Sequence, residues 1–198
     1  MAEASFTVKE RVVYPGQGVG EIVEISEKKF KENILTYYVI YFEESDMTVL
    51  VPAIKAGELG IRTIVSVDEA QNALTFLSEK FEPIPSDWKM RYQMNLDLFK
   101  TGSILDNASI VRSLYHRSKI KELPIQERKL YDSAYRIFHD ELSCALQKTK
   151  QEIEALIHSY LEPLGEAYMP GGKEDSADDD IFGDSMDDLD DDDGFDEE

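Results

Sequence analysis

The amino-acid sequence predicts an α+β protein in which a small antiparallel β part precedes a compact helical part. Three observations indicate this order. Short runs of alternating or β-branched apolar residues occur within residues 11–65. Apolar residues at helical spacing then recur through residues 66–161. Residues 174–198 carry 15 acids and no base, which predicts disorder because like charge with little apolar surface cannot offset the entropy of ordering.

The β part consists of short strands separated by turns and polar stretches. The predicted strands are residues 11–14, 19–25, 37–42, 47–51 and 61–65. Pro15, Gly16 and Gly18 predict a tight turn between the first two strands, and residues 26–33 are interpreted as a polar break. The strands before and after residues 43–46 form a predicted hairpin with two apolar faces. This leaves two alternatives: the strands curl into a barrel partly covered by the helices, or a strand edge stays available to a partner.

Capping residues mark the predicted helices. Ser66 and Glu69, three residues apart, are a capping box at the start of the first helix. Ser86 or Asp87 caps the helix that contains Trp88, and Gly102 ends it.

Pro124 suits the first turn of a long helical pattern that forms one helix or two in tandem. With these boundaries, four parts are predicted. They are a β module at residues 1–67, a connecting helix and proline-containing linker at 68–85, a helical domain at 86–165, and a disordered acidic tail at 166–198.

Catalysis finds little support in the sequence. The histidines show no metal-ligand spacing, and His139, Asp140 and Glu141 are interpreted as a solvated helix face. We therefore predict no enzyme activity, cofactor, metal or small-molecule substrate. Cys144 is the single cysteine, which excludes an intramolecular disulfide and favours a reducing compartment. With no signal-peptide pattern and no apolar run long enough for a membrane span, we expect a cytoplasmic protein without a membrane partner.

The charge distribution indicates a nucleic-acid partner. The chain has a net charge of −20, yet residues 88–150 carry 12 bases against 7 acids. Trp88, the only tryptophan, opens this segment. Its spacing with Tyr92, Leu96 and Phe99 predicts a buried stripe, but an aromatic side chain among cations can also enter a minor groove and unstack a base step. Both interpretations stay open on pattern alone.

Two sets of motifs resemble the CarD/CdnL family of bacterial transcription regulators, whose N-terminal module is shared with the transcription-repair coupling factor. The first set is Val12-Val13-Tyr14-Pro15-Gly16-Gln17-Gly18-Val19-Gly20, Met47-Thr48-Val49-Leu50-Val51-Pro52 and Gly60-Ile61-Arg62-Thr63-Ile64-Val65-Ser66. The second is Trp88, Arg91-Tyr92, Asn95-Leu96, Lys100-Thr101-Gly102, Val111-Arg112-Ser113-Leu114 and Leu123 with Glu127-Arg128-Lys129. The resemblance covers residues 6–147.

The resemblance implies a Tudor-like β barrel that docks on the RNA polymerase β subunit, and a helical domain that contacts promoter DNA and steadies the open complex. The implied DNA-binding residues are Trp88, Lys89, Arg91, Arg112, Arg117, Arg128 and Lys129. The implied polymerase-binding residues are Lys28, Thr48, Val49, Leu50, Val51 and Pro52. Leu50 and Gln93 stand where the family pattern has basic residues, so we expect a more apolar polymerase contact and a weaker DNA contact.

The function predicted from the sequence is therefore that of a non-enzymatic transcription regulator, which we expect to be a monomer. The alternative is a protein-protein adaptor with a β docking module and a basic helical body that does not bind DNA. For the acidic tail, competition with DNA for the basic surface and a simple solubilising role both remain open.

Overall fold

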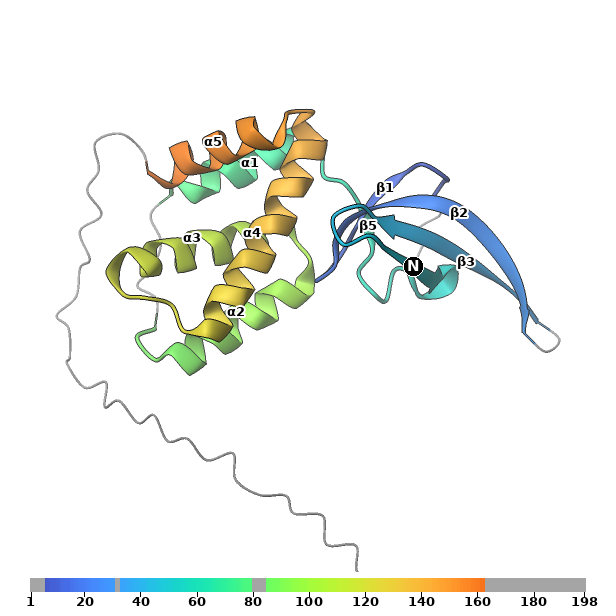
Figure 1. The fold of residues 1–198 in the computed structure, drawn as a ribbon, viewed down its shortest axis with the longest axis horizontal. Coiled ribbons are helices and arrows are strands. Elements are labelled where there is room, and N and C mark those ends of the chain that lie inside the picture. Colours follow the sequence, from blue (N-terminus) through green and yellow to red (C-terminus); the bar gives the residue numbers. More distant parts are fainter. Residues whose placement is uncertain (1–5, 31–32, 80–84, 163–198) are drawn as a thin grey trace, which may run out of the picture. The chain divides into compact units, whose positions relative to one another are not determined.

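The computed structural model describes residues 6–30, 33–79 and 85–162, and the predicted tail at 166–198 lies outside these residues. The N-terminal part is a single antiparallel sheet with the strand order β4-β3-β2-β1-β5 (Figure 1). Its strands are β1 (Arg11–Tyr14), β2 (Gly18–Phe30), β3 (Asn33–Phe42), β4 (Met47–Pro52) and β5 (Arg62–Thr63). A short 3-10 helix, η1 (Ala53–Lys55), follows β4.

The long hairpin of β2 and β3 differs from the prediction. Residues 26–33 were interpreted as a polar break, whereas β2 continues to Phe30 and β3 begins at Asn33, with Glu27 opposite Thr36 and Lys28 opposite Leu35. Backbone pairing forms the ladder here, and the exposed polar side chains carry no apolar alternation that would reveal it. The predicted hairpin connection at residues 43–46 is confirmed, because β3 ends at Phe42 and β4 begins at Met47.

One face of the sheet forms its own apolar core. The buried residues are Phe6, Val12, Ile22, Tyr38, Ile40, Phe42, Val51, Ala56 and Ile61. Gly20 lets β2 approach the side chains of β3, because a Cβ at this position would lie 2.7 Å from Ile40 and 2.9 Å from Phe42. Among the described strands, β4 and β5 are the two edges and do not pair with each other, so the sheet is open rather than a closed barrel.

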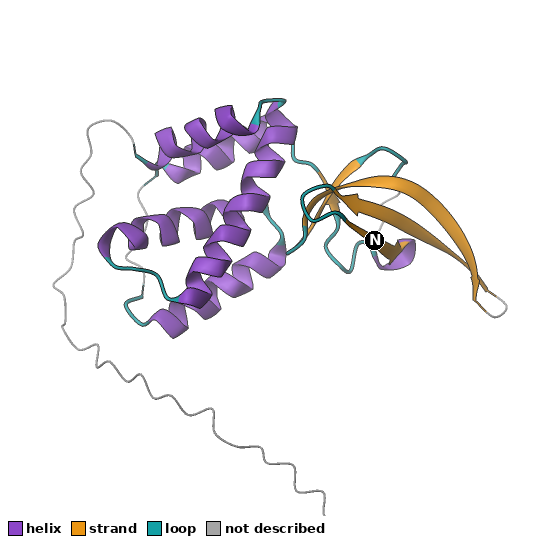
Figure 2. Cartoon of the chain, viewed as in Figure 1, coloured by secondary structure: helices purple, strands orange, loops and turns teal. Residues whose placement is uncertain are grey.

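After the sheet the described chain is mainly helical, as Figure 2 shows in purple. They are α1 (Val67–Leu77), α2 (Trp88–Thr101), α3 (Ile104–Ile120), α4 (Ile125–Leu146) and α5 (Lys150–Leu161). The predicted caps are confirmed. Ser66 and Glu69 form a capping box on α1, the Asp87 side chain accepts from the Lys89 amide, and Gly102 ends α2 with φ +72°. The long pattern after Pro124 forms two helices, because Gln147 ends α4 in the left-handed region and Thr149 caps α5.

The helix α1 belongs to the helical core rather than to a linker. Its buried residues Ala70, Ala73, Leu74 and Leu77 join one cluster with residues of α3, α4 and α5. The sequence places α1 between a strand and a proline pair, and its single apolar stripe does not reveal which core it covers. The helical part therefore begins at α1, about twenty residues earlier than the predicted boundary at residue 86.

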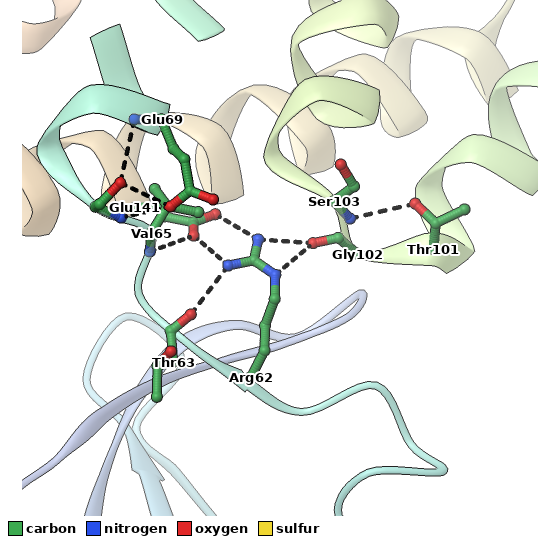
Figure 3. A network of polar contacts seen from close by, with 9 residues as sticks. Arg62, Thr63, Val65, Glu69, Thr101, Gly102, Ser103 and Glu141 are labelled. Carbon is green, nitrogen blue, oxygen red and sulfur yellow. Dashed lines mark hydrogen bonds and ion pairs between the residues drawn. The ribbon is translucent and has the colours of Figure 1, made fainter. Parts of the chain in front are cut away.

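A polar network joins the sheet to the helical part (Figure 3). The Arg62 guanidinium, at β5, donates to both carboxylate oxygens of Glu141 in α4, with Nη2 lying 2.9 Å from Oε2. It also donates to the Gly102 carbonyl at the end of α2, at 3.1 Å from Nε and 2.7 Å from Nη2. The Val65 amide adds a 3.3 Å bond to Glu141. The interpretation of Glu141 as part of a solvated face is therefore wrong, since its side chain is fully buried.

Candidate nucleic-acid and polymerase interfaces

Trp88 is the first residue of α2, and this position decides its exposure. The Asp87 carboxylate caps the helix by accepting from the Lys89 amide at 2.8 Å. Farther along the helix, Tyr92, Leu96 and Phe99 pack against the helical core as the predicted stripe requires. Trp88 lies at the end of this stripe and remains 37% exposed. An indole held at a helix start with an accessible ring has the form that a groove wedge requires.

Lys89 lies next to the indole ring. Its Nζ is 5.9 Å from the Trp88 ring centroid, within the range of a cation–π contact, and the side chain is exposed. Trp88 and Lys89 therefore offer an aromatic surface and a positive charge from adjacent positions of one helix start.

Arg91 differs from its predicted role. Its side chain is 2% exposed and forms a bidentate ion pair with Glu127, whose side chain is fully buried. The two N–O distances are both 2.7 Å, from Nε to Oε1 and from Nη2 to Oε2. A guanidinium in this position presents no donor to a phosphate, so Arg91 is not a DNA-contacting residue of this conformation.

Arg112 is also mostly withdrawn from solvent, at 7% exposure. Its guanidinium carbon lies 3.9 Å from the Phe76 ring centroid, and Nη1 donates to the Phe76 carbonyl at 2.7 Å. Burial lowers the pKa of this guanidinium from its ordinary value. Arg112 therefore joins α3 to the end of α1, in contrast to its predicted place on a DNA surface.

The remaining predicted cations lie at neighbouring helix ends. Arg117 is half-buried in the last turn of α3, whereas Arg128 and Lys129 are exposed in the first turns of α4. Four residues separate these two helices, and the Arg91–Glu127 pair joins the start of α2 to the start of α4. The ion pair of Arg128 with Glu122 is long, 3.9 Å, and exposed on both sides, so it neutralises Arg128 only weakly.

The acidic residue Glu162 contacts the last turns of α3. Glu162, just beyond α5, lies 2.8 Å from Lys119 Nζ and accepts a hydrogen bond from the Tyr115 hydroxyl. These bonds, with Lys119 contributing most, lower the pKa of Glu162, while burial raises the pKa of Tyr115. Lys119 is therefore already engaged in an ion pair within the protein.

The predicted polymerase-binding residues lie mainly on the edge strand β4. Leu50 is 43% exposed and pairs with Val39 of β3, and Pro52 pairs with Tyr37. Lys28 of β2 lies over the Tyr37 ring, with Nζ 5.9 Å from its centroid. The exposed sheet face thus combines apolar side chains with one cation, beside a strand edge that has no partner among the described strands.

The other predicted residues of β4 divide between the two faces. Thr48 is exposed and Val49 is half-buried. Val51 is 2% exposed and belongs to the sheet core, so its side chain is not part of an accessible surface. The alternation of a strand places successive side chains on opposite faces, which explains why a continuous run of residues cannot all contact one partner through side chains.

Sequence reasoning did not identify Glu127 and Glu141 as partners in buried ion pairs. The two glutamates form buried ion pairs with Arg91 and Arg62. A signal for both is present, since each falls at a position where the helical stripe of α4 requires an apolar residue.

The described residues thus offer an apolar strand edge in the sheet, and an exposed tryptophan and cations at helix ends in the helical part, which are surfaces typical of a protein that binds macromolecules. Two family models match: the CarD-like/TRCF RID domain over residues 6–65, and the CarD C-terminal domain over residues 72–158. The chain belongs to the CarD family, whose members are transcription factors that interact with RNA polymerase and are generally not enzymes.

A curated relative supports this assignment. The Bacillus subtilis (strain 168) protein named "Putative transcription factor YdeB" is 36% identical over 154 residues, which cover 76% of this chain and 98% of the relative. Within the described residues, no helix of the chain has both the length and the apolar character needed to cross a membrane.

Proposed function

We propose that this protein binds the RNA polymerase β subunit through its sheet and promoter DNA through its helical part, and that it stabilises the open promoter complex at initiation. The observation that carries the DNA half of this proposal is Trp88, which is 37% exposed at the first position of α2 beside Lys89. Its indole enters the minor groove next to the melted region, where an apolar wedge is inserted between base steps.

The cations at the starts of α2 and α4 and at the end of α3 supply the sequence-independent part of DNA binding. The residues that neutralise phosphates are Lys89, Arg117, Arg128 and Lys129. Arg91 and Arg112 are left out of this surface because both are buried in contacts within the protein.

Polymerase docking uses the sheet edge. The strand β4 offers its unpaired backbone groups to an edge strand of the partner, and Leu50 with Val39 supplies apolar contact. The apolar contact of Leu50 and Val39 is completed by three further residues of the sheet: Lys28, Thr48 and Pro52. The sheet module is the part of the chain that matches the RID domain, an RNA polymerase β-interacting domain, which supports this choice of partner.

The deciding experiment measures the half-life of the open promoter complex with purified bacterial RNA polymerase and the full chain. Trp88→Ala should shorten the half-life about tenfold or more, since without the wedge the cost of unstacking a base step, a few kcal/mol, is no longer offset by contact with the indole. Met90→Ala is the matched control, because Met90 is 57% exposed on the same first turn of α2. Equal half-lives for wild type and Trp88→Ala would contradict the wedge. If the full chain also failed to bind duplex DNA at low salt, the protein would be an adaptor.

A further inference from the structure

Arg91 makes contacts with two separate parts of the helical region. Through Nε and Nη2 it binds both carboxylate oxygens of Glu127, each at 2.7 Å. Through Nη1 it donates to the backbone carbonyls of Pro85 at 2.7 Å and Ser86 at 3.2 Å. All three guanidinium nitrogens are therefore used in bonds within the chain.

These contacts surround the residue that carries the proposed wedge. Pro85 and Ser86 lead into Asp87, which caps α2, and Trp88 follows at the first helical position. The carbonyl bonds thus fix the chain before Trp88, while the pair with Glu127 fixes the turn of α2 after it. Glu127 lies in the first turn of α4, directly before Arg128 and Lys129.

Burial of the Arg91–Glu127 pair is by itself weak evidence that the pair stabilises the fold. The side chains are 2% and 0% exposed, so both charges have lost their hydration. A buried ion pair is in general no more stabilising than well-packed apolar side chains of similar size, because desolvation offsets the attraction. What a bidentate pair supplies in addition is one fixed geometry, set by the planar guanidinium and the carboxylate.

We propose that Arg91 and Glu127 are positioning residues, which hold the Trp88 wedge and the Arg128–Lys129 cations in one fixed arrangement for DNA. This inference rests on the proposed function, since it assigns a role to Trp88 in the open complex. It replaces direct DNA contact by Arg91 with an indirect role: the guanidinium orders the start of α2 and joins it to the start of α4.

The test uses the full chain with Arg91→Met and Glu127→Leu combined. This double variant removes both charges and fills the space with apolar groups, so the fold should be retained. It also removes the bonds to the Pro85 and Ser86 carbonyls, so Trp88 should become more mobile. Trp88 is the only tryptophan, so its fluorescence anisotropy reports this residue alone and should fall. The open-complex half-life should shorten about tenfold, which corresponds to ~1.4 kcal/mol.

A stability control separates positioning from general loosening. Ile157→Ala opens a cavity at a fully buried position of α5 and lowers the melting temperature, but it touches neither helix start, so anisotropy and half-life should stay near wild type. Should the double variant fail to fold, Arg91→Lys carries the same test, because a lysine keeps the positive charge opposite Glu127 but lacks the planar fork that binds both carboxylate oxygens and the two carbonyls. Wild-type anisotropy and half-life in a folded pair variant would overturn the inference.

Comparison with Trp88→Ala distinguishes the two proposals. If Trp88→Ala leaves the half-life unchanged, the wedge function fails, whereas the anisotropy of the pair variant still reports whether Arg91 fixes Trp88. If Trp88→Ala shortens the half-life and the pair variant does not, the wedge stands and the positioning role is overturned.

Discussion

Arg62 of β5 and Glu141 of α4 form a bidentate ion pair between the sheet and the helical part, with Nη2 of Arg62 2.9 Å from Oε2 of Glu141. The side chain of Glu141 is fully buried and that of Arg62 is 29% exposed. The same guanidinium donates to the Gly102 carbonyl, so a single side chain joins β5 both to α4 and to the end of α2.

Removing one partner of this pair should destabilise the protein strongly. Glu141→Ala leaves the Arg62 charge at the junction without its carboxylate, and the expected loss is about 3 kcal/mol of unfolding free energy. Urea denaturation of the full chain measures it. Lys100→Ala is the control, because its ion pair with Asp97 is more than half exposed on both sides and should contribute under about 1 kcal/mol. Similar losses for the two variants would contradict a structural role for the junction pair.

A charge on the edge strand should weaken polymerase binding without unfolding the sheet. Leu50→Glu places a carboxylate in the proposed apolar contact, and recovery of the β subunit in a pull-down should fall at least about tenfold. Leu105→Glu is the matched control, since Leu105 is 46% exposed in the first turn of α3, where an acid suits the helix start. Undiminished recovery with Leu50→Glu would exclude β4 as the docking strand.

Trp88 should contribute less to stability than a core aromatic residue does. Because its side chain is 37% exposed, Trp88→Ala is expected to lower the unfolding free energy by about 1 to 2 kcal/mol. Phe138→Ala, at a fully buried position of α4, should lower it by about 3 to 5 kcal/mol. Thermal unfolding monitored by circular dichroism compares the two variants. Equal losses of unfolding free energy would show that Trp88 is a core residue.

The start of α4 should account for part of the salt dependence of DNA binding. Each phosphate contact contributes about 0.9 to the slope of log Kobs against log salt, so combining Arg128→Ala and Lys129→Ala should reduce the slope by about 2. Titrations of duplex DNA at several salt concentrations measure this slope. Lys148→Ala, an exposed cation just beyond the other end of α4, should leave it unchanged. A slope that is insensitive to both variants would place the DNA contact elsewhere.

Gly102 should tolerate no side chain. Its φ is +72°, and a Cβ would lie 2.5 Å from Pro15 Cγ, so Gly102→Ala combines backbone strain with a steric clash. The left-handed conformation alone costs about 1 to 2 kcal/mol for an alanine, and the clash should add to this. Gly57→Ala is the control, because no atom lies within 4 Å of its Cβ position. Differential scanning calorimetry should show a lower melting temperature for Gly102→Ala alone.

Features that depend on a few neighbouring residues could be predicted from the sequence. The capping box of Ser66 and Glu69 and the left-handed end of α2 at Gly102 are set by bonds within a few positions, and both were predicted correctly. Residues 26–33 were assigned wrongly, because the ladder there is held by backbone groups whose pairing leaves no mark in the side-chain pattern.

The candidate site could be predicted only in part, because burial of a charge depends on a distant partner. From the sequence Arg91 was assigned to the surface, because its partner Glu127 lies 36 positions later and the pairing forms only in the folded chain. Arg112 likewise needs the Phe76 ring and carbonyl of α1. Trp88 shows the opposite case: its spacing matches the buried stripe, yet its place at the first position of α2 leaves it accessible.

The separation of Arg62 and Glu141 along the chain also sets an order for events during synthesis. The two residues are 79 positions apart, so the sheet is complete well before α4 has been made. At a translation rate of about 5 to 20 residues per second, this interval lasts about 4 to 16 s. Throughout this interval the Arg62 guanidinium has no carboxylate to bind, so the junction can close only after Glu141 has been synthesised.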